Sequence, residues 1–118
     1  MLATRNHAIT VTTLGQPYDD DRRALLRAEF RHHVKYGRRL HVIDLDQAGT
    51  PDNSLLAGLV CALRTARGAG GDVRLVSNQR SMRRVLSYTG LSEVFGVHTS
   101  VLDAMLAFRQ QTVRKLAA

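Results

Sequence analysis

The sequence predicts a single α/β domain with a mainly parallel central sheet and about four helices. Its 118 residues suit one domain, and its 44% hydrophobic and 23% charged residues are typical of globular proteins. Strand-like and helix-like segments alternate along the chain, with short connections between them. Such alternation favours right-handed crossovers, which place successive strands parallel to one another in one sheet.

Four short segments have the composition of strands. They are residues 9–14, 40–45, 73–76 and, more weakly, 94–97. The first is rich in β-branched residues and is followed by Gly15 and Pro17, which favour a turn. The second is mostly apolar, as expected for a strand that is covered on both faces.

Four other segments carry apolar residues at helical spacing. Their apolar positions include Leu26, Phe30 and Val34, then Leu56, Leu59, Val60 and Leu63, then Met82, Val85 and Leu86, and finally Val101, Ala104, Met105 and Phe108. Asp19, Asp20 and Asp21 are expected to begin the first helix, where carboxylates cap free N–H groups. Ser100 and Asp103 have the spacing of a capping box for the last helix.

Composition also bears on the cellular compartment. The lone Cys61 excludes an internal disulfide and suits a reducing cytoplasm. No apolar run approaches the roughly 20 residues needed to cross a bilayer, and Arg5 interrupts the start before a signal peptide could develop. The sequence therefore predicts a cytoplasmic protein that is not inserted in a membrane.

The charge is strongly basic, with 17 Lys and Arg against 10 acidic residues and a net charge of +7. This balance favours an acidic partner. Aromatic residues are only 5% and Trp is absent, so the stacking platforms of single-strand nucleic-acid binders are not visible, and direct DNA binding is not expected. Arg80, Arg83 and Arg84, on the third predicted helix, could belong to a surface for an acidic partner or to a solvated helix face.

Asp44 and Asp46, at the end of the second predicted strand, are candidates for an enzyme site. Two such carboxylates could serve as nucleophile and general acid of a magnesium-dependent phosphatase. Residues 75–78 resemble the second motif of the haloacid-dehalogenase phosphatases. The first motif of that family, D-x-D-G-T, is interrupted here by Gln47 and Ala48. We therefore do not expect an enzyme, and the two aspartates are more simply polar groups at the end of a strand.

Histidine and cysteine offer no better site. His32 and His33 are adjacent on a predicted helix, so their side chains point in different directions, and no acidic or Cys partner has ligand spacing. Cys61 flanks an apolar stripe and is interpreted as a small buried residue. No metal and no cofactor are expected.

Asp52, Asn53 and Ser54 precede the second predicted helix and allow two interpretations. In the first, Asp52 or Ser54 is the helix N-cap and accepts hydrogen bonds from free backbone N–H groups. In the second, Ser54 is a phosphorylation site. A phosphate there adds about −1.5 to −2 charges at the positive end of the helix dipole, which would alter a docking surface without unfolding the helix.

Residues 40–106 resemble a STAS domain of the anti-sigma factor antagonist type. The resemblance rests on the strand LHVIDL, a turn ending in D-x-S, an apolar helix, Gly-Gly before the strand VRLV and, most specifically, the stretch RRVLSYTGLSEVF. Residues 1–18 match the family least well. The resemblance implies one STAS-like domain over residues 1–118, with an N-terminal strand region in residues 1–18.

The resemblance also implies a function. Proteins of this type bind an anti-sigma factor with serine kinase activity, and phosphorylation by that kinase ends the complex. Their motif D-S-S/T-G falls on Asp52, Asn53, Ser54 and Leu55, which implies phosphorylation at Ser54. Leu55 replaces the glycine of the motif. The expected partner-binding residues are Asp52, Asn53, Ser54, Leu55, Arg83 and Arg84.

Alternative functions remain open at this stage. The chain could be a STAS scaffold subunit of a signalling or lipid-transport complex that is never phosphorylated. The magnesium-dependent phosphatase is a weaker alternative, and nucleic-acid binding rests on charge alone. Homodimer formation is neither indicated nor excluded by the sequence.

Overall fold

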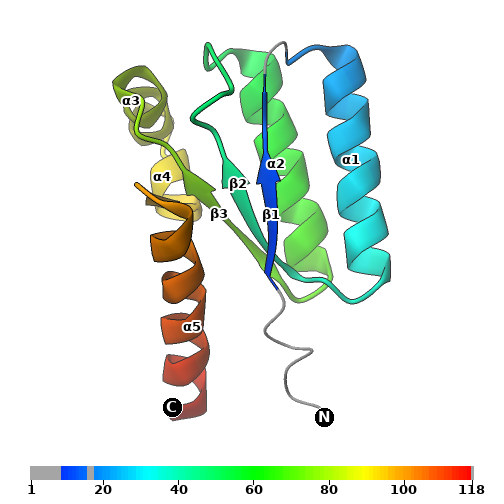
Figure 1. Cartoon of the computed structure of the whole chain (residues 1–118), viewed down its shortest axis with the longest axis vertical. Helices are drawn as coiled ribbons and strands as arrows, with labels where there is room; N and C mark the ends of the chain where they lie inside the picture. The colour runs from blue at the N-terminus through cyan, green and yellow to red at the C-terminus, as the bar shows by residue number, and fades with distance from the viewer. Residues whose placement is uncertain (1–8, 16–17, 118) are drawn as a thin grey trace.

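Four parallel strands form the centre of the domain (Figure 1). The computed structural model describes residues 9–15 and 18–117, with side chains as far as residue 111. The strands lie side by side in chain order: β1 (Ile9–Thr13), β2 (Leu40–Asp44), β3 (Asp72–Val76) and β4 (Gly96–His98). The register pairs Ile9 with Leu40 and Leu40 with Asp72. The predicted parallel α/β domain is thus confirmed, while Pro17 lies outside the described residues.

Helices cover both faces of this sheet. They are α1 (Asp20–Lys35), α2 (Asn53–Gly68), α3 (Arg80–Tyr88), α4 (Leu91–Val94) and α5 (Val101–Ala117). The helices α1 and α2 lie together on one face, α5 packs on the other against β2, β3 and β4, and α3 and α4 lie beyond the β4 edge (Figure 1). The four longer helices are those that the apolar spacing predicts, and α4 is a single additional turn.

The alternation of side chains in the strands separates two cores. Ile43 and Leu75, both fully buried, belong to the larger core beneath α1 and α2. Val42 and Val76 point to the other face and pack with Phe108 of α5. The sheet is therefore covered on both sides at β2 and β3, as the apolar character of these segments predicts.

The predicted strand at residues 94–97 is wrong at its start. Val94 ends the short helix α4, and the N–H of Phe95 donates to the carbonyl of Leu91 at 2.8 Å. Phe95 is 1% exposed and anchors the end of α4 in the core, so that strand pairing starts only at Gly96. An apolar run this short cannot by itself distinguish a buried helical turn from a strand.

The carboxyl ends of the four strands lie along one side of the sheet, called here the carboxyl edge, and their amino ends lie along the opposite side, the amino edge. All described strands run the same way, so α1, α2, α3 and α5 each begin near the carboxyl edge. The strand β1 begins at the opposite, amino edge, and α5 ends there too (Figure 1).

None of the described helices combines the length and apolar character needed to span a bilayer.

His41 is a polar residue that is fully buried in β2. Its ring stacks on Phe30 with centroids 4.4 Å apart, and its Nε2 donates to the carbonyl of Arg38 at 3.0 Å. The pKa of His41 is lowered from 6.5 to about 4, mainly by burial and to a smaller extent by nearby His33, while the bond to Arg38 partly opposes the shift. The folded domain therefore favours the neutral ring.

We expect the free energy of unfolding to fall by about 2 kcal/mol between pH 7.5 and pH 5 because of His41. The unfolded chain binds the proton first, so this stability is complete above pH 6.5 and is lost as the pH falls towards 4. Urea unfolding of the wild type and of His41→Phe at both pH values measures the difference. An unchanged pH dependence in the variant would assign the effect to other groups.

Candidate functional site

The helix start at Asp52 settles which residue is the cap. The Oδ1 of Asp52 accepts a hydrogen bond from the N–H of Leu55 at 2.9 Å, which makes Asp52 the N-cap of α2. Ser54 then lies in the first turn of the helix and is half-buried, while Asp52 and Asn53 are exposed. The Ser54 hydroxyl is thus not used for capping, and it lies at the electropositive end of a 16-residue helix.

A cation from another helix reaches this hydroxyl. The Nη1 of Arg23, in α1, donates to the Oγ of Ser54 at 3.3 Å. The Nη2 of the same guanidinium lies 2.9 Å from the Oδ1 of Asp20. Among the described residues, the side chain bonded to Ser54 is therefore a cationic donor and not a base, so Ser54 lacks the activation of a catalytic nucleophile.

The side chain of Leu55 does not lie on the surface, where a partner-binding residue was expected. Its side chain is 1% exposed and packs in the core beneath α1 and α2. One residue further along a helix turns the side chain by about 100°, so Leu55 points inward while Ser54 remains at the surface. Leu55 therefore cannot offer its side chain to a partner in this conformation, and it does not crowd the Ser54 hydroxyl.

Tyr18, which precedes α1, packs against α2 near the Ser54 site. Its hydroxyl is buried without a hydrogen-bond partner among the described residues, and it lies so close to Gly58 that a Cβ there would collide with it. Burial raises the pKa of Tyr18 above 10.0; Arg23 opposes this effect and Asp52 adds to it. Gly58 thus lets the chain leading to α1 lie directly against α2.

Asp44 and Asp46 hold loops together. The Oδ1 of Asp44 accepts from the N–H of Asp46 at 3.0 Å. The carboxylate of Asp46 accepts from the backbone N–H of Asn78 at 2.6 Å and from its Nδ2 at 2.9 Å. Gln79 donates to the Asp46 carbonyl at 2.8 Å. The Asp46 carboxylate thus joins the loops after β2 and β3, while that of Asp44 holds the first of these loops at the end of its strand.

The arginines of α3 form a second, separate feature at this edge. Arg80, Arg83 and Arg84 are exposed and, with Asn78, Ser87 and Tyr88, line an open hollow of about 580 Å³. Arg83 also donates to the carbonyl of Ser77 at 2.9 Å, which fixes the start of α3 to the end of β3. In the described part of the chain, no hydrogen bond or ion pair links these arginines to Ser54.

The other candidate residues do not form a site. The rings of His32 and His33 meet edge to face, with centroids 5.8 Å apart. Within residues 9–15 and 18–117, no three His, Cys, Asp or Glu side chains are grouped so as to hold a metal ion. Cys61 is half-buried beside the groove between α1 and α2, so it is less enclosed than its sequence position predicts.

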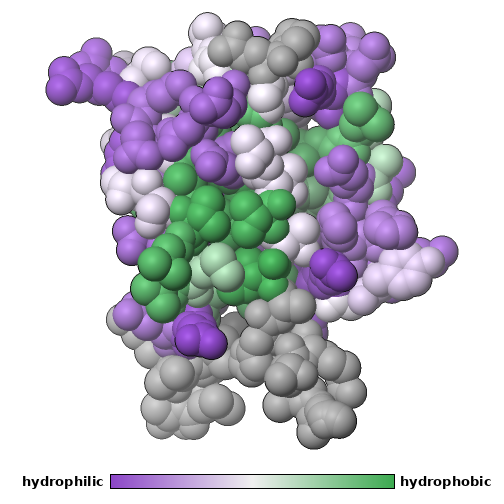
Figure 2. All heavy atoms as spheres, viewed as in Figure 1, coloured by the Kyte–Doolittle hydropathy of each residue, from purple (hydrophilic) through white to green (hydrophobic). Residues whose placement is uncertain are grey.

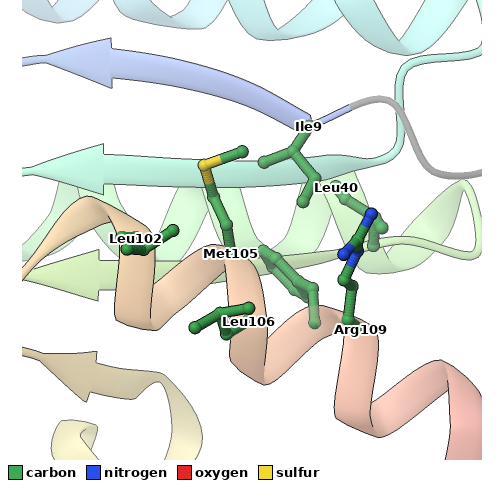
Figure 3. Close-up of a pocket in the computed structure, with 7 residues that line it drawn as sticks. Ile9, Leu40, Leu102, Met105, Leu106 and Arg109 are labelled. Atoms are coloured by element: carbon green, nitrogen blue, oxygen red, sulfur yellow. The ribbon is translucent and has the colours of Figure 1, made fainter.

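An apolar groove lies on the other face of the sheet (Figure 2). It has a volume of about 290 Å³ and is formed between the starts of β1 and β2 and the helix α5 (Figure 3). Its lining residues are Ile9, Leu40, Leu102, Met105, Leu106, Phe108 and Arg109. Ile9 and Leu40 begin their strands, so the groove lies towards the amino edge and is not part of the Ser54 site.

Comparison with known proteins gives a family and a set of similar structures. The STAS domain family matches residues 1–104. No curated protein sequence matches the chain significantly. A crystal structure of a proposed anti-sigma factor antagonist from Thermotoga maritima, TM1081, is similar at a TM-score of 0.72 and 21% identity, covering 86% of this chain and 87% of that one.

Two further structures are similar to the chain. The NMR structure of TM1081 has a TM-score of 0.77 at 20% identity and covers 92% of this chain and 86% of its own. An anti-sigma factor antagonist from Mycobacterium paratuberculosis has a TM-score of 0.73 at 22% identity, with 86% of both chains covered. At these identities, the structural likeness establishes the shared fold.

Proposed function

The chain belongs to the STAS domain family, and from the position of Ser54 in this fold we propose that it is a regulatory module that binds an anti-sigma factor. Two of the similar structures are described as antagonists of such factors. The observation that carries the proposal is the Ser54 hydroxyl, which lies in the first turn of α2 beside exposed Asp52 and Asn53 and bonds only to a cation among the described side chains. We propose that the protein acts by binding, in the cytoplasm, and not as an enzyme.

The docking surface in this proposal has two parts at the carboxyl edge of the sheet. The first is the start of α2, with Asp52, Asn53 and Ser54. The second is the exposed face of α3, with Arg83 and Arg84, which suits acidic side chains of the partner. Leu55 supports the first part from within the core.

The proposed partner is an anti-sigma factor of the serine-kinase type, and phosphorylation of Ser54 is the switch. The γ-phosphoryl group of ATP passes to the Oγ of Ser54, ADP leaves, and the hydroxyl proton goes to a base of the kinase. The phosphate adds about −1.5 to −2 charges and new bulk to the docking surface. The helix tolerates the new charge because its N-terminus is electropositive, so association changes while the fold stays intact.

Phosphorylation can be tested with candidate anti-sigma kinases and ATP, followed by mass spectrometry. We expect one phosphate on Ser54, and none on the Ser54→Ala variant. Ser81→Ala is the matched control, because Ser81 is an exposed serine in the first turn of α3. Stable binding without any phosphate on Ser54 would instead support an unphosphorylated scaffold.

A further inference from the structure

We propose that Arg23 exchanges its ion-pair partner when Ser54 is phosphorylated: the guanidinium leaves the carboxylate of Asp20 and pairs with the phosphate. This inference rests on the proposed function, since it concerns the regulation of the same serine. It assigns to Arg23, in α1, the role of a positioning residue for a modification in α2.

The geometry of the guanidinium supports this exchange. Its Nη1 is already 3.3 Å from the Oγ of Ser54, and its Nη2 is 2.9 Å from the Oδ1 of Asp20. A phosphate attached to that Oγ would place its oxygens next to both nitrogens without movement of the backbone. The planar fork of an arginine matches two phosphate oxygens in the way that it matches a carboxylate.

The charges make the phosphate the stronger partner. The Asp20 side chain is 89% exposed and carries one negative charge, so its pair with Arg23 is screened by water and contributes little. The Arg23 side chain is less exposed, at 37%. A phosphate on Ser54 brings about twice the charge of a carboxylate to the Nη1 of Arg23, whose contact with Ser54 is part-buried, whereas the contact of Nη2 with Asp20 is exposed.

Acidic groups near Ser54 would repel a phosphate, and this cation would offset that repulsion. The phosphate on Ser54 would lie close to the N-cap carboxylate of Asp52 and, across the helix pair, to that of Asp20. Arg23 is the described side chain that contacts Ser54 and can neutralise this concentration of negative charge. The exchange would therefore hold the phosphate against the domain and join the start of α1 to the start of α2.

The experiment uses the full chain with phosphoserine incorporated genetically at position 54, so no kinase is needed. Titration of the phosphate by ³¹P NMR reports its second pKa, which is about 6 for a free phosphoserine. We expect Arg23→Gln to raise this pKa by about half a unit relative to the wild type, because an opposite charge in contact favours the dianion.

Arg31→Gln is the matched control. Arg31 is exposed on the same helix, and eight residues of helix place it about 12 Å further along, beyond the Debye length of about 10 Å at 0.1 M salt. Its replacement removes the same charge and should leave the phosphate pKa unchanged. Asp20→Asn, which removes the competing carboxylate, should lower that pKa or leave it as in the wild type.

Equal phosphate pKa values in Arg23→Gln and Arg31→Gln would overturn the exchange. So would a phosphate pKa in Asp20→Asn that rises to the Arg23→Gln value. Neither result would contradict the docking proposal. That proposal fails separately if Ser54 is not phosphorylated and its variants bind the anti-sigma factor normally. Circular dichroism of the Arg23→Gln protein checks that the fold is retained.

Discussion

Ser54→Asp is expected to weaken binding of the anti-sigma factor by about 30-fold or more, equivalent to roughly 2 kcal/mol, while the domain keeps its fold. The new carboxylate would stand on the docking surface at the start of α2, where a partner that fits a neutral hydroxyl has no cation to meet it. Arg23 can pair with this carboxylate from within the domain, but the pair must still lose water against a partner that contributes no opposite charge, which is costly. The helix itself accepts the charge in its first turn.

Two further variants show whether the loss of affinity comes from the charge at position 54, from the size of the new side chain, or from the change in net charge. Ser54→Asn adds similar bulk without charge and should weaken binding less. Gln110→Glu adds one negative charge at an exposed position of α5, at a distance from the carboxyl edge, and should leave the affinity nearly unchanged. Calorimetric titration gives the affinities and thermal melts follow the fold. Equal affinity of the wild type and Ser54→Asp would remove Ser54 from the docking surface.

Leu55→Gly, which restores the glycine of the family motif, is expected to lower the free energy of unfolding by about 3–5 kcal/mol. The loss combines a cavity under α1 and α2 with the low helix propensity of glycine. Most single domains are stable by only about 5–15 kcal/mol, so this one change could consume much of the total. Urea unfolding measures it directly.

Leu102→Gly is the matched control, because it makes the same substitution in the first turn of α5 at a side chain that is 64% exposed. It should lower the free energy of unfolding by only about 1 kcal/mol, mainly through helix propensity, with a small loss of contact where Leu102 lines the apolar groove. If the two variants were equally stable, the inward orientation of Leu55 would not contribute to the core. The control also measures how much glycine in the first turn of a helix lowers the stability.

Much of the fold could be predicted from the sequence because local patterns decide it. The aspartates at the start of α1 and the Ser100–Asp103 pair were expected to cap helices. In the structure, Asp19 accepts a hydrogen bond from the N–H of Arg22 at 2.9 Å. Ser100 likewise accepts from the N–H of Asp103 at 3.0 Å. The start of β4 could not be placed, because Val94 and Phe95 suit a strand as well as a turn of helix. Packing of Phe95 in the core decided between them.

The placement of the candidate site residues in the fold was predicted in part. The motif placed Asp52, Asn53 and Ser54 at the start of a helix, but it could not show that Leu55 turns inward. The contact between Arg23 and Ser54 spans 31 positions and depends on how α1 lies beside α2, so no local pattern could reveal it. The bond between Asp46 and Asn78 is equally distant in sequence, at 32 positions, and it explains an aspartate pair that otherwise suggests catalysis.

The position of the amino edge has a practical consequence. Because β1 starts and α5 finishes at the edge opposite Ser54, a tag or linker joined beyond either of them leaves the domain on the far side from the proposed docking surface. Immobilising the protein on a sensor chip through such a tag would present the starts of α2 and α3 outward. Antibody, bead or fluorophore attachments made there should accordingly leave the proposed contact with an anti-sigma factor unhindered.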